Sequence, residues 1–497
     1  MQKRKEQSMT IKNLGKIITG LAGAGIITIL LLDVVGLGKP GLQAGQLSAT
    51  LFGILVMAVG IGLAQSPEQE KNALSALRDA LNNLLCQPVY IWIIAGFGIS
   101  YFLFFISPTI FNTDLRFTYY NRYLPEHYPI GGDFIMTIDA IKTVIIGQEI
   151  PKILYPPLLN ILFSPFILLD YPQSYYIISA ITLLSLVILV VFIPKQLIRI
   201  REQPIIALVL TGSLLSYGLQ FELERGQSHT IAFMFCIFGV YLFHKHPNMR
   251  LLSYFLFSIS MQMKVYPVIF VLLFIQDWRV WSENIKRFIG LGLLNASLLF
   301  LHGTDYFIHF YQDMIVSAVN SPENYIDNHS VKAFTFNLVH NNFGALDPDL
   351  LKILKPNASM IEMGLIALCF LCLGLVLWQA YRENRPGINL RLLFACTLLC
   401  LLVPALNHDY TLGLLAGAFV LFTGDIQLQG GFRRRTLSIL LIVIMALAYS
   451  ATFYPFKYRP LELASTFPML LTLLLTSTTL TFILPWKAQD TKITASQ

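Results

Sequence analysis

Long apolar runs separated by short polar segments repeat along almost the whole chain. Because the hydrocarbon core of a bilayer holds no water, the backbone of such a run must bond within itself, as it does in a helix. We count roughly thirteen or fourteen runs that are long enough, or nearly so, to cross a bilayer. They begin near Leu14, Leu47, Val89, Lys152, Gln173, Pro204, Ser228, Leu251, Ile285, Met360, Leu390, Asp409, Arg435 and Thr466. The pattern predicts an all-α, polytopic transmembrane protein with about 12–14 spans.

Two long segments interrupt the apolar pattern, at 107–151 and 304–359. Loops of this length in a compact protein are usually functional or disordered. Both contain many aromatic, asparagine, histidine and proline residues rather than low-complexity sequence, so we expect folded, functional loops. The polar stretch 65–87 has leucines at helical spacing and is expected to form an amphipathic helix at the membrane surface.

The distribution of lysine and arginine predicts the orientation in the membrane. Five basic residues before position 17 place the N-terminus in the cytoplasm, and the clusters at 278–287, 382–391 and 433–435 belong there too. Both long loops and the corner at 406–410 then share the outer face of a multi-pass protein, which we expect in the plasma (inner) membrane. With this assignment of sides, basic residues stay in the cytoplasm throughout only if the Tyr155-Pro156-Pro157 segment is re-entrant or short. The run 251–275 must then be broken near Lys264.

Composition supports a membrane protein and disfavours other classes. The 497 residues are 55% hydrophobic and only 13% charged, whereas soluble domains have about a quarter of their residues charged. The net charge of +7 comes largely from turns between apolar runs and therefore reports orientation rather than nucleic-acid binding. Cys369 and Cys372 have CxxC spacing without a second pair or histidines, which favours packing. We expect no metal and no cofactor.

Asp133 is the foremost candidate for catalysis. It follows Gly131 and Gly132, which allow close backbone approach, and apolar neighbours surround it. A carboxylate in such a place can accept a proton from a hydroxyl group. It can equally be the N-cap of a helix, where aspartate is favoured. Asp139 is a weaker candidate on the same loop.

Lys264 is the second candidate, because it has apolar neighbours on both sides and Pro267 follows it. A charged residue at membrane depth is costly and is usually functional. Its ammonium group could neutralise a lipid phosphate. Alternatively, the side chain extends to the membrane surface.

Three further polar clusters lie between apolar runs. Arg225 and Gln227, around a glycine, form either a polar turn or contacts to a sugar or phosphate. Asn407 and His408 lie at an outer corner, where the imidazole could donate to a phosphate oxygen or the segment could be a capped turn. The pair Asn341-Asn342 in the second loop has the same two interpretations. The sequon at Asn328 is a weak three-residue match.

Taken in order, these features resemble glycosyltransferase family 87, the alpha-mannosyltransferase-like glycosyltransferases of the GT-C superfamily. The resemblance covers about 133–410 and depends on order and spacing. The matching positions are Asp133, Gly147, Tyr155-Pro156-Pro157, Pro165, Gly226-Gln227, Lys264-Val265-Tyr266-Pro267, Trp278-Arg279, Asn341 or Asn342, and His408. The corner before His408 lacks the serine and tryptophan common in some members, and the first two runs look additional.

The resemblance implies a GT-C fold and a polyprenyl-phosphate sugar donor, with mannose, another hexose or a pentose transferred to a lipid or glycan hydroxyl. It implies that Asp133 deprotonates the acceptor and that Lys264 and His408 stabilise the departing phosphate, with inversion at the anomeric carbon. Tyr155, Gln227 and Arg225 would contact the phosphate or sugar. Secondary candidates are Asp139, Asn341, Asn342 and Asn407.

This interpretation divides the chain into N-terminal spans with the surface helix (1–106), a GT-C-like catalytic membrane core that includes both loops (107–424), and C-terminal spans with a tail (425–497). The main alternative is a transporter or flippase of a lipid-linked sugar. Internal repeats or paired charges at the bilayer midplane would favour it, and neither is evident in the sequence. A polymerase or ligase of lipid-linked glycans would instead carry its key residues in a large late loop.

Overall fold

The computed structural model describes residues 16–25, 88–101, 130–146, 155–197, 203–214, 216–316, 328–342, 344, 346–425, 432–450 and 466–483. Within these ranges the fold is all-α, as predicted, and the one β feature is an isolated antiparallel bridge between Asn328 and His408. The expected amphipathic helix at 65–87 lies outside the described residues.

Among the described residues, three helices are long and apolar enough to cross a membrane: Tyr171–Leu197, Pro348–Glu383 and Thr466–Ile483. A further pair, Pro204–Leu214 and Tyr217–Arg225, passes the same test together but bends by 48° at a short break. Shorter apolar helices accompany them at Val89–Ile99, Pro157–Leu168, His229–Lys245, Leu390–Leu402, Asp409–Thr423 and Arg435–Tyr449. The chain is therefore a helical integral membrane protein with several spans, and the full number of spans stays a prediction.

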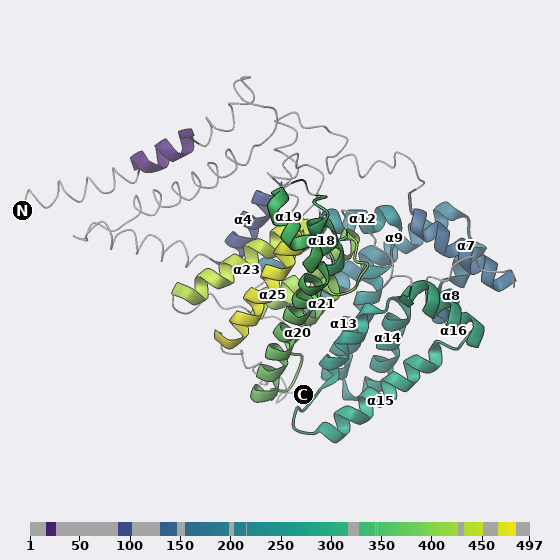
Figure 1. The fold of residues 1–497 in the computed structure, drawn as a ribbon. Helices are drawn as coiled ribbons and strands as arrows, with labels where there is room; N and C mark the ends of the chain where they lie inside the picture. The colour runs from purple at the N-terminus through teal and green to yellow at the C-terminus, as the bar shows by residue number, and fades with distance from the viewer. Residues whose placement is uncertain are drawn as a thin grey trace, which may run out of the picture.

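The helices form two flanks around a central group (Figure 1). On one flank α4 (Val89–Tyr101) packs on α23 (Phe432–Ser450), which packs on α25 (Thr466–Ile483). The central group contains α13 (His229–Lys245), α14 (Arg250–Met263), α20 (Ala358–Glu383) and α21 (Leu390–Leu402). The other flank contains α7 (Gly132–Ile146), α8 (Pro157–Phe163) and α16 (Thr304–Phe310). The main apolar core lies in the central group and the first flank, and a smaller core joins α7, α8, α13 and α14.

The remaining helices connect these groups. They are α9 (Tyr171–Val187), α10 (Ile193–Leu197), α11 (Gln203–Leu214), α12 (Tyr217–Arg225), α15 (Trp281–Leu298), α18 (Val331–Val339), α19 (Pro348–Leu354) and α22 (Leu415–Asp425). Short 3₁₀ helices lie at η3 (Ser164–Leu168), η7 (Tyr266–Phe274) and η10 (Asp409–Leu414). A π-helical turn, η4 (Ile188–Phe192), joins α9 to α10.

Both predicted irregularities are confirmed. The Tyr155-Pro156-Pro157 segment opens a helix of only 7 residues, α8, which continues into η3. The run 251–275 breaks at Lys264, whose backbone is extended at φ −146° and ψ 140°, and it resumes as η7. Pro267 explains the break, because proline has no N–H to continue the α-helical ladder. The described parts of both long loops contain helices: α7 lies in the first loop, and α16, α18 and α19 lie in the second.

Candidate active site

A cavity of about 660 Å³ lies between α7, α8, η7, α16, α21 and the corner before η10. It brings together six of the residues predicted from sequence: Asp133, Tyr155, Gln227, Lys264, Asn407 and His408. Arg225 does not line the cavity itself but forms an ion pair with Asp133. Asp139, Asn341 and Asn342 are not among the residues that line it.

Two glycines bring the start of α7 against the end of α12. Gly131 has φ 79° and Gly226 has φ 67°, a region that other residues rarely adopt. A Cβ atom on Gly226 would lie 2.7 Å from Cβ of Phe134 and 3.1 Å from Cα of Gly131. The Gly131 N–H also donates to the carbonyl of Glu224. This contact places Asp133 beside the residues at the end of α12.

The carboxylate of Asp133 is held by side chains from α12 and the turn after it. Arg225 donates to Oδ2 through Nε at 3.1 Å and to Oδ1 through a terminal nitrogen at 2.5 Å. Gln227 Nε2 donates to Oδ2 at 2.6 Å. Asp133 is the second residue of α7 and its carboxylate binds these side chains, so the N-cap interpretation is wrong. The Asp133 side chain is 13% exposed and lines the cavity.

The same chain of hydrogen bonds extends to Lys264. Its Nζ donates to Oε1 of Gln227 at 2.9 Å and lies 4.9 Å from the centre of the Tyr155 ring. In the part of the chain that the structure describes, these direct contacts of the ammonium group are with neutral partners. Lys264 also lines the cavity rather than extending to the surface. Such a cation can bind an anionic ligand group in the cavity.

An aromatic wall, formed by His229, Tyr266, His408 and Tyr410, closes this end of the cavity. The ring of His229 stacks on Tyr266 at 5.7 Å with an interplanar angle of 6°, and it lies 5.0 Å from the ring of Tyr410. His408 packs on the other side of Tyr410 at 5.3 Å. Lys264 and these two histidines line the cavity together. The polar end of the cavity is therefore rich in basic groups.

His229 and Tyr306 line the cavity but were not predicted from the sequence. Nδ1 of His229 is buried and has no hydrogen-bond partner within the described residues. Tyr306, from the second loop, accepts from Asn160 at 2.7 Å and donates to the carbonyl of Tyr155 at 3.1 Å. Burial raises the pKa of Tyr306 to about 12, so its hydroxyl stays protonated and can make this donation. The only signal for His229 was its place two residues after Gln227, at the start of an apolar run.

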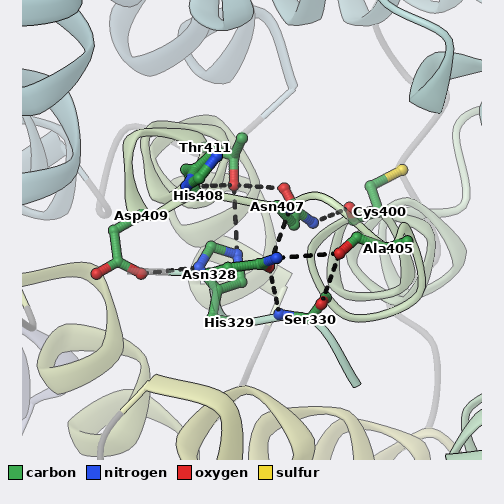
Figure 2. Close-up of polar contacts among 9 residues, drawn as sticks. All are labelled: Asn328, His329, Ser330, Cys400, Ala405, Asn407, His408, Asp409 and Thr411. Atoms are coloured by element: carbon green, nitrogen blue, oxygen red, sulfur yellow. Dashed lines mark hydrogen bonds and ion pairs between the residues drawn. The ribbon is translucent and has the colours of Figure 1, made fainter. Parts of the chain in front are cut away.

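The corner that carries His408 is fixed by hydrogen bonds from the second loop (Figure 2). Nδ1 of His329 lies 2.9 Å from Oδ1 of Asp409, and both side chains are fully buried. Thr411 Oγ1 lies 3.3 Å from the other His329 ring nitrogen and donates to Asn407 Oδ1 at 2.7 Å. Asn328 is also buried and hydrogen bonded, so its sequon is part of the folded core.

The three predicted candidates outside the cavity have local roles. Asp139 is 63% exposed and lies 3.5 Å from Lys142 on α7. Asn341, with φ 53°, accepts from the backbone N–H of Leu346 and forms a turn after α18. Asn342 donates to the side chain of Asn337 at 2.7 Å.

The rest of the cavity is mostly apolar. Its wall includes Val265, Val268, Ile269, Phe370, Leu399 and Val403. Among the described residues that line it, Asp133 is the one carboxylate. No group of three or more metal-ligating side chains occurs within the described residues. Glu222 on α12 does not line the cavity but is buried beside it, close enough to Lys264 for the two side chains to interact. It caps α13 by accepting from the backbone and hydroxyl of Thr230.

Comparison with known proteins gives one match. A family model described as glycosyltransferase family 87 matches residues 154–404, just over half of the chain. The matched segment runs from the start of α8 to the end of α21 and includes Tyr155, Arg225, Gln227 and Lys264. Asp133 and His408 lie outside it, on either side. No curated protein and no solved structure matches the chain.

Proposed function

The chain belongs to glycosyltransferase family 87, and from this premise we propose that it transfers a sugar from a polyprenyl-phosphate donor to a lipid or glycan hydroxyl. The observation that carries the proposal is the composition of the cavity. One end combines a single carboxylate with a lysine and two histidines, and the rest of the wall is mostly apolar. In a polyprenyl-phosphate sugar, the phosphate suits the lysine and histidines, the isoprenoid chain suits the apolar wall, and the sugar would lie next to the carboxylate. The sugar is expected to be mannose, another hexose or a pentose.

The basic end of the cavity supports binding of the donor phosphate. Lys264 contacts neutral groups directly, so a phosphate would give its ammonium group an anionic partner. His408 and His229 also line the cavity, and an imidazole N–H can donate a hydrogen bond to a phosphate oxygen. These groups would stabilise the negative charge that develops on the departing phosphate. Tyr155 would support Lys264 through its ring, and Asn407 would support His408 through the backbone.

Asp133 is proposed as the general base. Oδ2 accepts two hydrogen bonds within the described residues and Oδ1 accepts one, so Oδ1 can still receive a hydrogen bond from a substrate hydroxyl. Arg225 and Gln227 would orient the carboxylate without contacting the reacting atoms. Gln227 also joins the base to Lys264, because its amide donates to Asp133 and accepts from Lys264.

The proposed reaction is a single displacement. The acceptor oxygen forms a bond to the anomeric carbon while its proton moves to Asp133. The bond between the anomeric carbon and the phosphate oxygen breaks, and polyprenyl phosphate leaves with the electron pair. Attack opposite the leaving group inverts the anomeric configuration. Hydrolysis of ordinary glycosides uses a pair of carboxylates, one of them an acid for the leaving group. A phosphate leaving group does not need that acid, which agrees with one carboxylate in the cavity.

The test is a transfer assay with the full-length protein purified in detergent or reconstituted in nanodiscs. Radiolabelled polyprenyl-phosphate sugars are offered one at a time with a membrane lipid extract as acceptor. We expect transfer from at least one of them, and no transfer by Asp133→Asn protein purified in parallel. Transfer from nucleotide sugars instead would overturn the donor assignment. Movement of the intact lipid-linked sugar across a vesicle membrane, without transfer, would favour the transporter alternative.

A further inference from the structure

The segment Asn328-His329-Ser330 forms a clamp on the corner 405–411, about 80 residues further along the chain. The clamp acts on the backbone on both sides of His408. Asn328 Nδ2 and Ser330 Oγ each donate to the carbonyl of Ala405 at 3.0 Å, and the N–H of Asn407 donates to Oδ1 of Asn328 at 3.1 Å. The N–H of His329 donates to the carbonyl of Asn407 at 3.0 Å.

The side chains that flank His408 are fixed as well. Asn407 donates to the carbonyl of Cys400 at the end of α21, at 2.5 Å, and Asp409 pairs with His329 in full burial. The carbonyl of His408 itself accepts from the N–H of Thr411 at 2.9 Å and also lies 2.9 Å from the hydroxyl oxygen of Thr411. Figure 2 shows these bonds around the corner. His408 is therefore a half-buried cavity residue between two fully buried, bonded neighbours.

The donors and acceptors around His329 indicate how the pair is protonated. Thr411 has one hydroxyl proton and faces three acceptor positions: Asn407 Oδ1, the His408 carbonyl and Nε2 of His329. If both ring nitrogens of His329 carry protons, Nδ1 donates to Asp409 and Nε2 donates to Thr411. Thr411 can then donate onward to Asn407. In that state the carboxylate of Asp409 compensates the charge of the imidazolium.

We infer that His329, Asp409 and Thr411 are positioning residues for the active site, which act through His408 and fix its place beside the donor phosphate. This inference rests on the proposed function of the cavity. None of these three residues lines the cavity, so they do not contact the donor. A loosened clamp would let the imidazole of His408 move away from the phosphate, and a shift of about 1 Å can cost about a hundredfold in rate.

A double-mutant cycle tests this inference. The kcat/KM for the donor is measured for the wild type, Asp409→Asn, His408→Ala and the double variant, in nanodiscs. We expect Asp409→Asn to lose about tenfold or more, because an amide oxygen is a weaker acceptor than a carboxylate for the ring N–H of His329 and the clamp is loosened. The double variant should be within about twofold of His408→Ala alone, since residues that act through one another are non-additive. If the losses multiply, Asp409 does not act through His408 and the inference is overturned.

Asn295→Ala is the matched control. Asn295 is buried on α15 and bonds to Ser258 on α14, far along the chain from the corner. Its effect on kcat/KM, if any, should multiply with that of His408→Ala. If Asp409→Asn protein does not fold, Thr411→Val takes its place in the cycle, since valine has nearly the same shape and lacks the hydroxyl.

Hydrogen exchange of the corner gives a result that does not depend on activity. Without substrate, Asp409→Asn or Thr411→Val should raise exchange at 405–411 and leave α13 unchanged. Unchanged exchange at the corner would overturn the clamp even if the variants were less active. The two proposals can also fail separately. If the wild type transfers no sugar from any donor, the proposed function and the role assigned to His408 are overturned. Faster exchange at the corner in the variants would then still support the clamp.

Discussion

Asp133 and Asp139 lie six residues apart on α7, yet their surroundings differ in every respect that matters for catalysis. The Asp133 side chain is 13% exposed and accepts three hydrogen bonds from Arg225 and Gln227. The Asp139 side chain is 63% exposed and has a long contact with Lys142. Exposed pairs of this kind contribute little to stability, whereas a held carboxylate in a cavity can act on a substrate.

Asp133→Asn should therefore abolish transfer without unfolding the protein. The amide cannot accept a proton as a base, and loss of general-base catalysis costs about a hundred- to ten-thousand-fold in rate. Turnover and thermal melting in detergent are measured on the same preparation. Asp139→Asn is the matched control and should keep near-normal turnover. Near-normal transfer by folded Asp133→Asn would refute the base assignment.

Lys264→Met should weaken use of the donor more than it weakens the fold. Methionine keeps much of the side-chain volume and removes the charge, and a hydrogen bond to a charged group contributes about 1.5–3 kcal/mol, or roughly ten- to a hundredfold. We expect a higher KM for the donor, or a lower kcat, with an unchanged KM for the acceptor. Lys142→Met, on the exposed face of α7, is the control. Unchanged donor kinetics for Lys264→Met would remove Lys264 from the site.

At this scale the sequence predicted much of the site, because a polar residue within an apolar run is conspicuous. Asp133, Lys264, Gln227 and His408 were found in this way, and all line the cavity. The role of Arg225 as a partner of Asp133 could not be predicted, since 92 residues separate them. Tyr306 and His229 resemble ordinary loop and helix-start residues until the fold brings them to the cavity.

At the scale of elements, the site depends on how α7 meets α12. The left-handed backbone at Gly226 ends α12, and the missing side chain admits Phe134 and Gly131. Gly131 is equally restricted, because a Cβ atom there would clash with the rings of Tyr171 and Tyr175 on α9. Gly132 directly follows Gly131 in the sequence, yet a Cβ atom at Gly132 would meet nothing within 4 Å. Adjacent glycines thus have different roles.

Gly226→Ala should destabilise the protein and reduce transfer together. The left-handed backbone and the contact with Phe134 each cost about 1–3 kcal/mol for a residue with a side chain. Separation of α7 from α12 would also disturb the contact between Arg225 and Asp133. Gly132→Ala is the control and should be neutral or slightly stabilising, because alanine favours the helix. Melting temperature and turnover of both variants are compared. Equal behaviour of the two would contradict the role of Gly226.

The breaks in the helices were predictable where proline marks them, as at Pro156-Pro157 and Pro267. Both broken elements border the cavity, as expected for irregular backbone at membrane depth. The bend between α11 and α12 was not predicted, because no proline or charge marks the break. The π-helical turn after α9 was not predicted either, although Pro194 and Lys195 follow it closely. The helices inside the two long loops were expected only as folded structure. Their close contact with the cavity, through α7 and Tyr306, depends on the tertiary fold.

In the whole molecule, the cavity lies at one end of α13 and α14, and a cluster of basic residues lies at the other end. His229 begins α13 and Lys264 follows α14 at the cavity. Lys245 ends α13 and Arg250 begins α14 at the opposite end, where Arg250 and Arg287 both lie 5.4 Å from the ring of Phe243. A helix of 17 residues is about 25 Å long, comparable to the hydrocarbon core of a bilayer. Basic residues favour the cytoplasmic side, which agrees with the cavity facing outward.

Cysteine labelling in intact cells tests this orientation, and with it the choice of donor. Asp139→Cys is exposed near the cavity and should react with a membrane-impermeant maleimide added outside, in a background without native cysteines. Lys286→Cys, whose lysine side chain is 73% exposed on α15 towards the basic end, should react only after permeabilisation. Tags at the N-terminus and after Arg433 should report the cytoplasm, and a tag near Asn341 should report the outside. Nucleotide sugars are available in the cytoplasm, so a lipid-linked donor is needed only on the outer face. The opposite labelling pattern would place the cavity beside nucleotide sugars and remove the reason for a polyprenyl-phosphate donor.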